Sequence, residues 1–153
     1  MRSMKQLAVE ITSLVENSMA PLQSIPEKSM AEKPAPNKWS KKEIMGHLID
    51  SAQNNIRRFV VTQYEEAPLV VYDQDKWVAA SDYQDFDTKE ILQLWYLLNK
   101  QLSIILQHID ESMAGRLCRT QELHTLDWLA TDYIIHLKHH LHQVLDKESV
   151  TYP

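Results

Sequence analysis

Only two glycines, Gly46 and Gly115, occur in this chain of 153 residues. Tight β-hairpins favour glycine because their turns need backbone angles that side chains disfavour, whereas helices need few glycines. The scarcity of glycine therefore indicates an all-α fold. The chain length suits one domain, residues 1–153, with a core of ordinary size.

Four long stretches carry apolar residues at helical spacing. The first runs from about Ser3 to Ser18, and Pro21 and Pro26 are expected to end it, because proline lacks the N–H that a helix interior needs. A proline-rich connection follows the second of these prolines. The fourth stretch runs from about Thr125 to Lys147.

The second stretch has the clearest helix start. Ser40 is followed three residues later by Glu43, which is the spacing of a capping box, and Trp39 can pack on Ile44 as a hydrophobic staple. This helix is expected to run to about Gln63.

The third stretch begins in the same way and runs to about Ile109, with Asp87 as the cap and Glu90 three residues later. A long segment without helical periodicity precedes it, and a short helix is expected there from about Lys76 to Ala80. Connections of this length often cross the molecule. Four amphipathic helices predict a four-helix bundle, and a crossover would make the second and third helices parallel.

Composition argues against several classes of protein. A net charge of −5 does not suit a protein that binds nucleic acid by neutralising phosphates. The chain has no run of about 18 apolar residues that would span a membrane, and charged residues interrupt the N-terminal stretch, so we expect no signal peptide. The single cysteine, Cys118, fits a reducing compartment. We therefore expect a cytoplasmic protein.

Four of the seven histidines lie in the segment "HLKHHLHQ" near the end of the chain. A helix turns about 100° per residue, which places His136 and His140 on or beside the apolar face and turns His139 and His142 towards solvent. Two histidines four residues apart can bind one metal ion. The same spacing also fits two half-buried histidines that bond to backbone or water.

A third ligand would have to come from another helix. His47 lies at the edge of the apolar face of the second helix, which is the position that His136 and His140 have on theirs. A lone histidine at such an edge is otherwise a packing residue. His108 and His124 lie near expected helix ends, where we expect them to be solvated or to cap the helix.

The segments "KWSKKEIMGHLIDSAQNNIRR" and "LATDYIIHLKHHLHQV" together resemble the DinB/YfiT family of metal-dependent proteins. The family motif combines a Trp-Ser helix start, a histidine about one and a half turns into that helix, and a late H-x3-H followed by glutamine. The resemblance covers the chain from Trp39 to Gln143. The residues that match the motif are Trp39, Ser40, His47, His136, His140 and Gln143.

The resemblance implies a four-helix bundle with an up-down-down-up path and a long crossover between its second and third helices. It also implies a divalent metal ion, zinc or nickel, held by His47, His136 and His140. Three imidazoles leave a coordination position open, as catalytic sites do, and an ion there lowers the pKa of a bound water or thiol.

Relatives of this kind suggest either hydrolysis of a small molecule or S-transfer that uses a low-molecular-weight thiol. The alternative is a non-catalytic bundle that binds a metal or another ligand, and a homodimer would be usual for such bundles. Ser51 and Asn55 either line a substrate pocket or are polar residues at its edge. Arg58 either holds an anionic substrate or pairs with a carboxylate on its helix, and Gln143 either bonds a ligand or caps the groove. Asp50 is expected to be a solvated carboxylate.

Overall fold

The computed structural model describes residues 2–152. Four long helices form its body: α1 (Met4–Gln23), α3 (Lys41–Val61), α5 (Thr88–His108) and α6 (Leu126–Val144). The connections contain the short helices α2 (Glu27–Ala31) and α4 (Gln74–Ser81), the 3-10 turns η1 (Tyr83–Asp85) and η2 (Glu111–Met113), and the strands β1 (Leu117–Arg119) and β2 (Leu123–Thr125).

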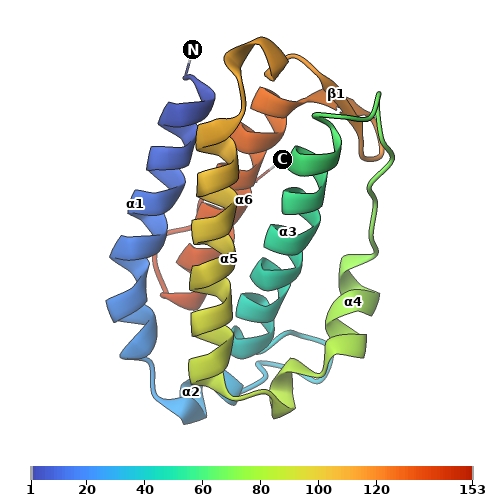
Figure 1. The fold of residues 1–153 in the computed structure, drawn as a ribbon. Coiled ribbons are helices and arrows are strands. Elements are labelled where there is room, and N and C mark those ends of the chain that lie inside the picture. The colour runs from blue at the N-terminus through green and yellow to red at the C-terminus, as the bar shows by residue number, and fades with distance from the viewer. Residues whose placement is uncertain (1, 153) are drawn as a thin grey trace.

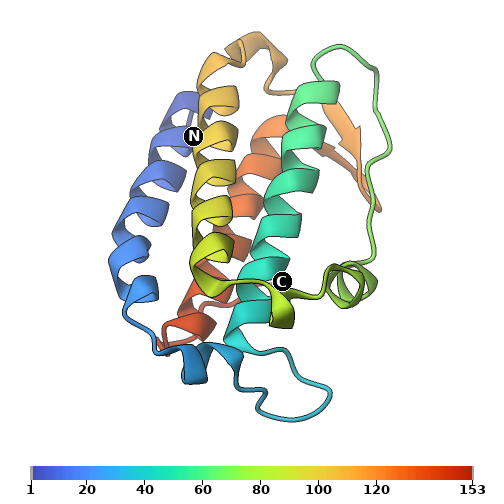
Figure 2. The same cartoon turned by 60° about the horizontal axis from the view of Figure 1, so that its bottom comes forward.

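The four long helices form a bundle in which α3 and α5 run in parallel. Figure 1 shows α1 and α6 running one way and α3 and α5 the other, so that the path is up-down-down-up. Within the bundle, α5 packs against α1 and α3, and α6 packs against the same two helices. The crossover, residues 62–87, returns along the outside of α3 and carries α4 beside it (Figures 1 and 2). The predicted bundle and its crossover are confirmed.

The helix starts follow local sequence signals. Ser40 and Glu43 form the predicted capping box, in which each side chain bonds to the other residue's backbone N–H. Ser3 and Gln6 form a second capping box at the start of α1, and the Asp87 side chain accepts from the backbone of Lys89. Such caps satisfy N–H groups that have no partner within the helix.

One predicted helix end is wrong, because Pro21 lies inside α1 and the helix continues to Gln23. A proline removes one backbone N–H, but in the last turn of a helix this loses a single hydrogen bond. The buried Leu22 holds that turn against the core, and the N–H of Ser24 closes it on the carbonyl of Ala20.

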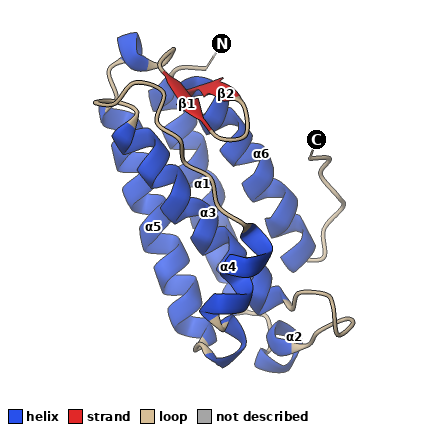
Figure 3. Ribbon diagram, turned by 90° about the vertical axis from the view of Figure 1, so that its right-hand side faces the viewer, coloured by secondary structure: helices blue, strands red, loops and turns tan. Residues whose placement is uncertain are grey.

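The short elements were not predicted, apart from α4. The proline-rich connection contains α2, and a hairpin of β1 and β2 lies between α5 and α6 (Figure 3). The hairpin needs no glycine, because its turn at residues 120–122 is closed by a bond from the Thr120 N–H to the Glu122 carbonyl and contains no positive φ angle. Strands of three residues are also too short to show a period.

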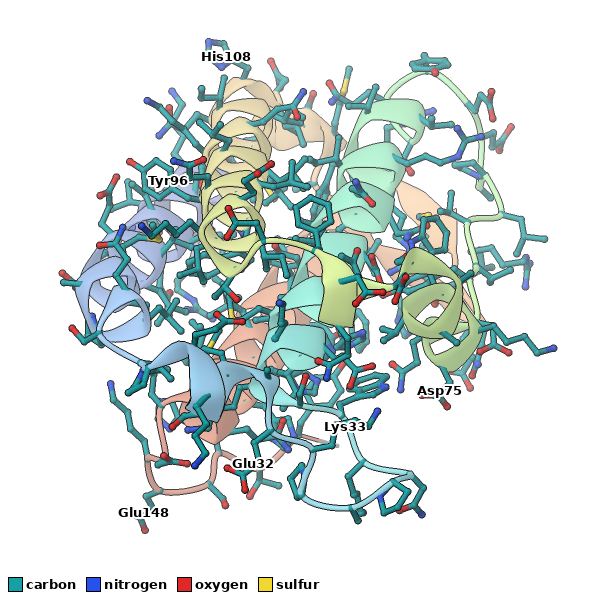
Figure 4. The ribbon with its side chains drawn as sticks, turned by 90° about the horizontal axis from the view of Figure 1, so that it is seen from below. Glu32, Lys33, Asp75, Tyr96, His108 and Glu148 are labelled. Carbon is teal, nitrogen blue, oxygen red and sulfur yellow. The ribbon has the colours of Figure 1, made fainter. Side chains whose placement is uncertain are left out.

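The core lies between the four long helices, and its largest fully buried side chains are Trp95 of α5 and Phe59 of α3. Figure 4 shows Glu32, Lys33, Asp75 and Glu148 at the periphery of the molecule. No helix among residues 2–152 is long and apolar enough to cross a membrane.

The crossover is held in place near both of its ends, by the hairpin at one and by α3 at the other. Near its start, the Val70 N–H bonds to the Arg119 carbonyl, which ties the crossover to the hairpin. Near its end, the ring of Tyr83 lies directly over Gly46 of α3, where a Cβ atom would come within 2.1 Å of the ring. The Tyr83 hydroxyl also donates to the buried carboxylate of Asp50.

Candidate metal centre

Three histidines from two antiparallel helices converge at one point of the structure. His47 comes from the second turn of α3, and His136 and His140 come from successive turns of α6. Their ring centroids are 4.5 to 5.0 Å apart, and one nitrogen from each ring lies within 4.8 Å of the other two. Residues separated by about 90 positions in the sequence therefore meet as one cluster.

The geometry of this cluster suits a divalent ion. The Nε2 atoms of His47 and His136 are 3.1 Å apart. Two imidazoles that bind one tetrahedral ion at 2.0–2.1 Å would have their nitrogens roughly 3.3 Å apart. The Nδ1 atom of His140 lies 2.8 Å from the Gln143 Oε1 atom. Because that amide oxygen can only accept, Nδ1 carries the proton and the Nε2 lone pair of His140 is free to bind an ion.

Burial keeps these imidazoles neutral, which is the form that binds metals. His47 is 1% exposed, and its pKa is lowered to about 3 by burial and then by the proximity of His140. The pKa of His136 is lowered to about 2, chiefly by burial and further by His140, His47 and His139. At neutral pH the cluster therefore offers lone pairs, and protons do not compete for them.

The cluster opens on a cavity of about 540 Å³. Its walls are α3, the crossover, the hairpin, α6 and the C-terminal segment after α6. The lining residues are Ser51, Asn55, Arg58, Val71, Tyr72, Gln74, Thr120, Gln121, Glu122, His124, Trp128, Leu129, Asp132, Tyr133, His136, His139, His140 and Tyr152.

The sequence profile of the DinB superfamily matches residues 13–144. The chain belongs to the DinB superfamily. YfiT from Bacillus subtilis (strain 168) is 26% identical over 112 residues, which are 71% of this chain and 63% of YfiT, so the match spans less than two thirds of that relative. The solved structure of YfiT, described as an unusual four-helix bundle, has a TM-score of 0.79 at 22% identity and covers 95% of this chain and 87% of the YfiT chain.

The predicted pocket residues of this DinB-superfamily chain lie in two places. Ser51, Asn55 and Arg58 lie along α3 on the wall of the cavity. Gln143 is not among the residues that line it, and its side chain bonds to His140 instead. One turn of the helix separates Gln143 from His140, so its amide reaches the ring and not the cavity.

Two histidines that were expected to face solvent are half-buried. The Nδ1 atom of His139 bonds to the Val150 carbonyl, and that of His142 bonds to the Glu148 carbonyl. The segment after α6 causes this, because it folds back along the helix and covers the face that the sequence assigned to solvent (Figure 3). His139 also lines the cavity.

His108 and His124 have different surroundings. His108 is exposed at the far end of α5, where it bonds to the Ile104 carbonyl and projects away from the bundle (Figure 4). The expectation of a solvated or capping residue fails for His124, which lies in β2 and stacks on Trp128 with ring centroids 3.6 Å apart. Both rings of that pair line the cavity.

Several lining residues were missed by the sequence analysis, among them Asp132, Trp128 and Tyr152. The Tyr152 hydroxyl donates to Asp132, and its ring lies 5.2 Å from that of His136. A signal existed for Asp132, which stands four residues before His136 and therefore shares its face of α6. Hydrophobic periodicity cannot distinguish a polar face that lines a cavity from one that faces water.

Asp50 is buried at 0% exposure, and the expectation of a solvated carboxylate is wrong. The end of the crossover covers this side of α3 and supplies the Tyr83 hydroxyl that donates to Asp50. Burial raises the pKa of Asp50 to about 6, although the bond from Tyr83 opposes the shift.

This pKa predicts how Asp50 contributes to stability. Between its ordinary pKa of 3.8 and about 6, the folded state holds a proton that the unfolded state has lost. The contribution of Asp50 to the free energy of unfolding therefore falls as pH rises through this range. We expect Asp50→Asn to remove this fall. The free energy of unfolding of the variant, relative to that of the wild type, should therefore rise by about 2–3 kcal/mol between pH 4 and pH 7.

Urea unfolding of both proteins at several pH values measures this gain. Histidines with lowered pKa values make the free energy of unfolding rise with pH, which is opposite to the effect of Asp50. Both proteins share this rise, so only the difference between them isolates Asp50. A constant difference between the two proteins from pH 4 to pH 7 would contradict the prediction.

Proposed function

We propose that this chain is a metal-dependent hydrolase that acts on a small molecule, with a divalent ion held by His47, His136 and His140. The observation that carries the proposal is the convergence of three neutral imidazoles beside a cavity of about 540 Å³, which His136 and His140 line. The description of the related YfiT protein as a probable metal-dependent hydrolase supports it.

The chemistry of the donor set favours a reactive centre over a closed structural one. Among residues 2–152, no carboxylate or thiol joins the three histidines in the cluster, so the protein supplies three ligands and leaves a position open towards the cavity. A divalent ion bound there supplies Lewis acidity, which lowers the pKa of a water molecule or thiol and polarises a carbonyl or phosphoryl oxygen. Gln143 holds the ring of His140 in the orientation that this requires.

Zinc or nickel is the ion that we propose. Imidazole is a ligand for both, and an all-nitrogen site does not favour magnesium or calcium, which bind oxygen. Elemental mass spectrometry of protein purified without a metal column or a histidine tag should find about one equivalent of zinc or nickel per chain.

A thiol-dependent S-transfer at the same site is the related reaction, and the chain's own cysteine does not supply its thiol. Cys118 is 0% exposed, and its Sγ atom lies 3.5 Å from the Pro68 carbonyl on the hairpin side of the molecule. S-transfer would therefore require a low-molecular-weight thiol as a second substrate, whereas hydrolysis requires water alone.

The two reactions are separated by assaying the zinc-loaded and nickel-loaded protein with a panel of esters, amides and phosphoesters, with and without added thiol. We expect turnover without thiol that a chelator abolishes and added metal restores. Turnover that appears only with thiol would favour S-transfer. One ion per chain with no turnover in either condition would favour the alternative, a bundle that binds its metal without catalysis.

A further inference from the structure

The wall of the cavity also contains a cationic side chain, Arg58, about three turns further along α3 than His47. Arg58 of α3 lines the cavity and is half-buried. Its Nε and Nη2 atoms donate to the Val70 carbonyl at 3.2 and 3.0 Å, and its Nη1 atom donates to the Asn55 Oδ1 atom at 3.4 Å. These partners use three of the five guanidinium N–H groups and are all neutral.

Arg58 forms no salt bridge with a carboxylate among residues 2–152. Asp132 lines the same cavity, but it accepts the Tyr152 hydroxyl. Burial lowers the pKa of Arg58, and weaker attractions from Tyr72, Cys118, Asp132 and Tyr152 oppose this. Removing a cation from water without a counterion is costly, and the face of the Tyr72 ring, whose centroid lies 5.9 Å from the guanidinium carbon, offsets only part of this cost. An anionic group in the cavity would offset the rest.

The position of Arg58 relative to the histidines is fixed by a rigid helix. His47, Ser51, Asn55 and Arg58 follow one another at intervals of four, four and three residues along one face of α3. Eleven residues of helix correspond to about 16 Å. The long arginine side chain leans back towards the start of the helix, as its contact with Asn55 shows.

We propose that Arg58 is the recognition site for an anionic group, a carboxylate or phosphate, at the end of an elongated substrate whose reacting bond lies at the histidines. Arginine suits this task because its planar guanidinium can donate two parallel hydrogen bonds to such a group. Asn55 and Val70 hold the guanidinium and leave two N–H groups for the ligand. That the reacting bond lies at the histidines rests on the proposed function. That Arg58 binds an anion rests on the contacts of Arg58 alone.

The arginine end is tested on metal-free protein with inorganic phosphate as the probe. We expect a saturable shift of the Arg58 Nε–H resonance in the NMR spectrum and at least tenfold weaker phosphate binding in Arg58→Gln. Arg57→Gln is the matched control, because Arg57 is the exposed neighbour on the same helix. An Arg58 resonance that does not move in the wild type would overturn the proposal, and this result needs no variant to fold.

The span between the two ends is tested on zinc-loaded protein by calorimetry with suberate and octanoate, which have the same length and differ by one carboxylate. We expect suberate to bind at least tenfold more tightly than octanoate, and Arg58→Gln but not Arg57→Gln to abolish the preference. If Arg58→Gln preferred suberate over octanoate as strongly as the wild type does, the proposal would be overturned. If only the proposed metal site were wrong, Arg58 would still bind phosphate, both in the wild type and in His47→Ala. Failure of the proposed function and failure of the anion site at Arg58 therefore give different results.

Discussion

His47→Ala is expected to abolish metal binding as completely as His140→Ala does, although the two residues are 93 positions apart in the sequence. Both rings take part in one cluster with nitrogens within 4.8 Å, and an ion that loses one of three imidazoles keeps too few protein ligands. Loss of a supporting group around a metal site already costs about 10–100-fold in affinity, so we expect loss of a ligand to cost at least roughly 100-fold.

The measurement is metal content per chain after dialysis against zinc and then against buffer, with circular dichroism to verify that each variant is folded. His108→Ala is the matched control, because His108 is exposed and bonds only to its own helix. His139→Ala and His142→Ala should also keep the ion, since both rings bond to the segment after α6. If His139→Ala removed the ion and His47→Ala kept it, the proposed ligand set would be wrong.

Gly46→Ala is expected to destabilise the protein by about 3 kcal/mol, although alanine normally stabilises a helix interior by about 1 kcal/mol over glycine. No glycine among the described residues has a positive φ angle, so the backbone does not require glycine at this position. Steric contact excludes a side chain at this position, because a Cβ atom there would lie 2.1 to 2.5 Å from three atoms of the Tyr83 ring. Two of these atoms lie near the base of the ring, so a small rotation cannot clear them, and a displaced ring also loses its bond to the buried Asp50.

Urea unfolding at neutral pH measures this effect, and the other glycine supplies the control. A Cβ atom on Gly115 meets no atom within 4 Å, so Gly115→Ala should change the free energy of unfolding by less than about 0.5 kcal/mol. Repeating Gly46→Ala in a Tyr83→Ala background should remove most of its cost, because the colliding ring is absent. A cost that persists in that background would show that the contact with Tyr83 is not its cause.

Local signals in the sequence predict much of this fold. The capping box of Ser40 and Glu43 is closed between residues three apart, so it can be found without knowledge of the rest of the chain. The pairing of His136 with His140 also follows from helical period. The addition of His47 to this pair depended on the family resemblance, since periodicity places it on an edge of α3 and does not show which helix faces that edge.

The features that the sequence did not reveal arise from contacts between distant segments. Asp50 is buried because the end of the crossover covers it, and His139 is half-buried because the segment after α6 folds back over it. The surroundings of His124 depend on the hairpin, whose strands of three residues are too short to show a pattern. In each case the side chain is polar, and its burial is decided by a segment whose own sequence carries no period.

The hairpin between α5 and α6 has a consequence for how such proteins diverge. Its turn supplies Thr120, Gln121 and Glu122 to the cavity wall, whereas the three clustered histidines lie on helices. Turns at a surface tolerate insertions and substitutions that helices in a packed bundle do not. Lengthening or shortening this turn would therefore remodel one wall of the cavity and leave the positions of the histidines unchanged. A lineage built on this bundle can in this way change what its cavity admits while it inherits the same histidine cluster.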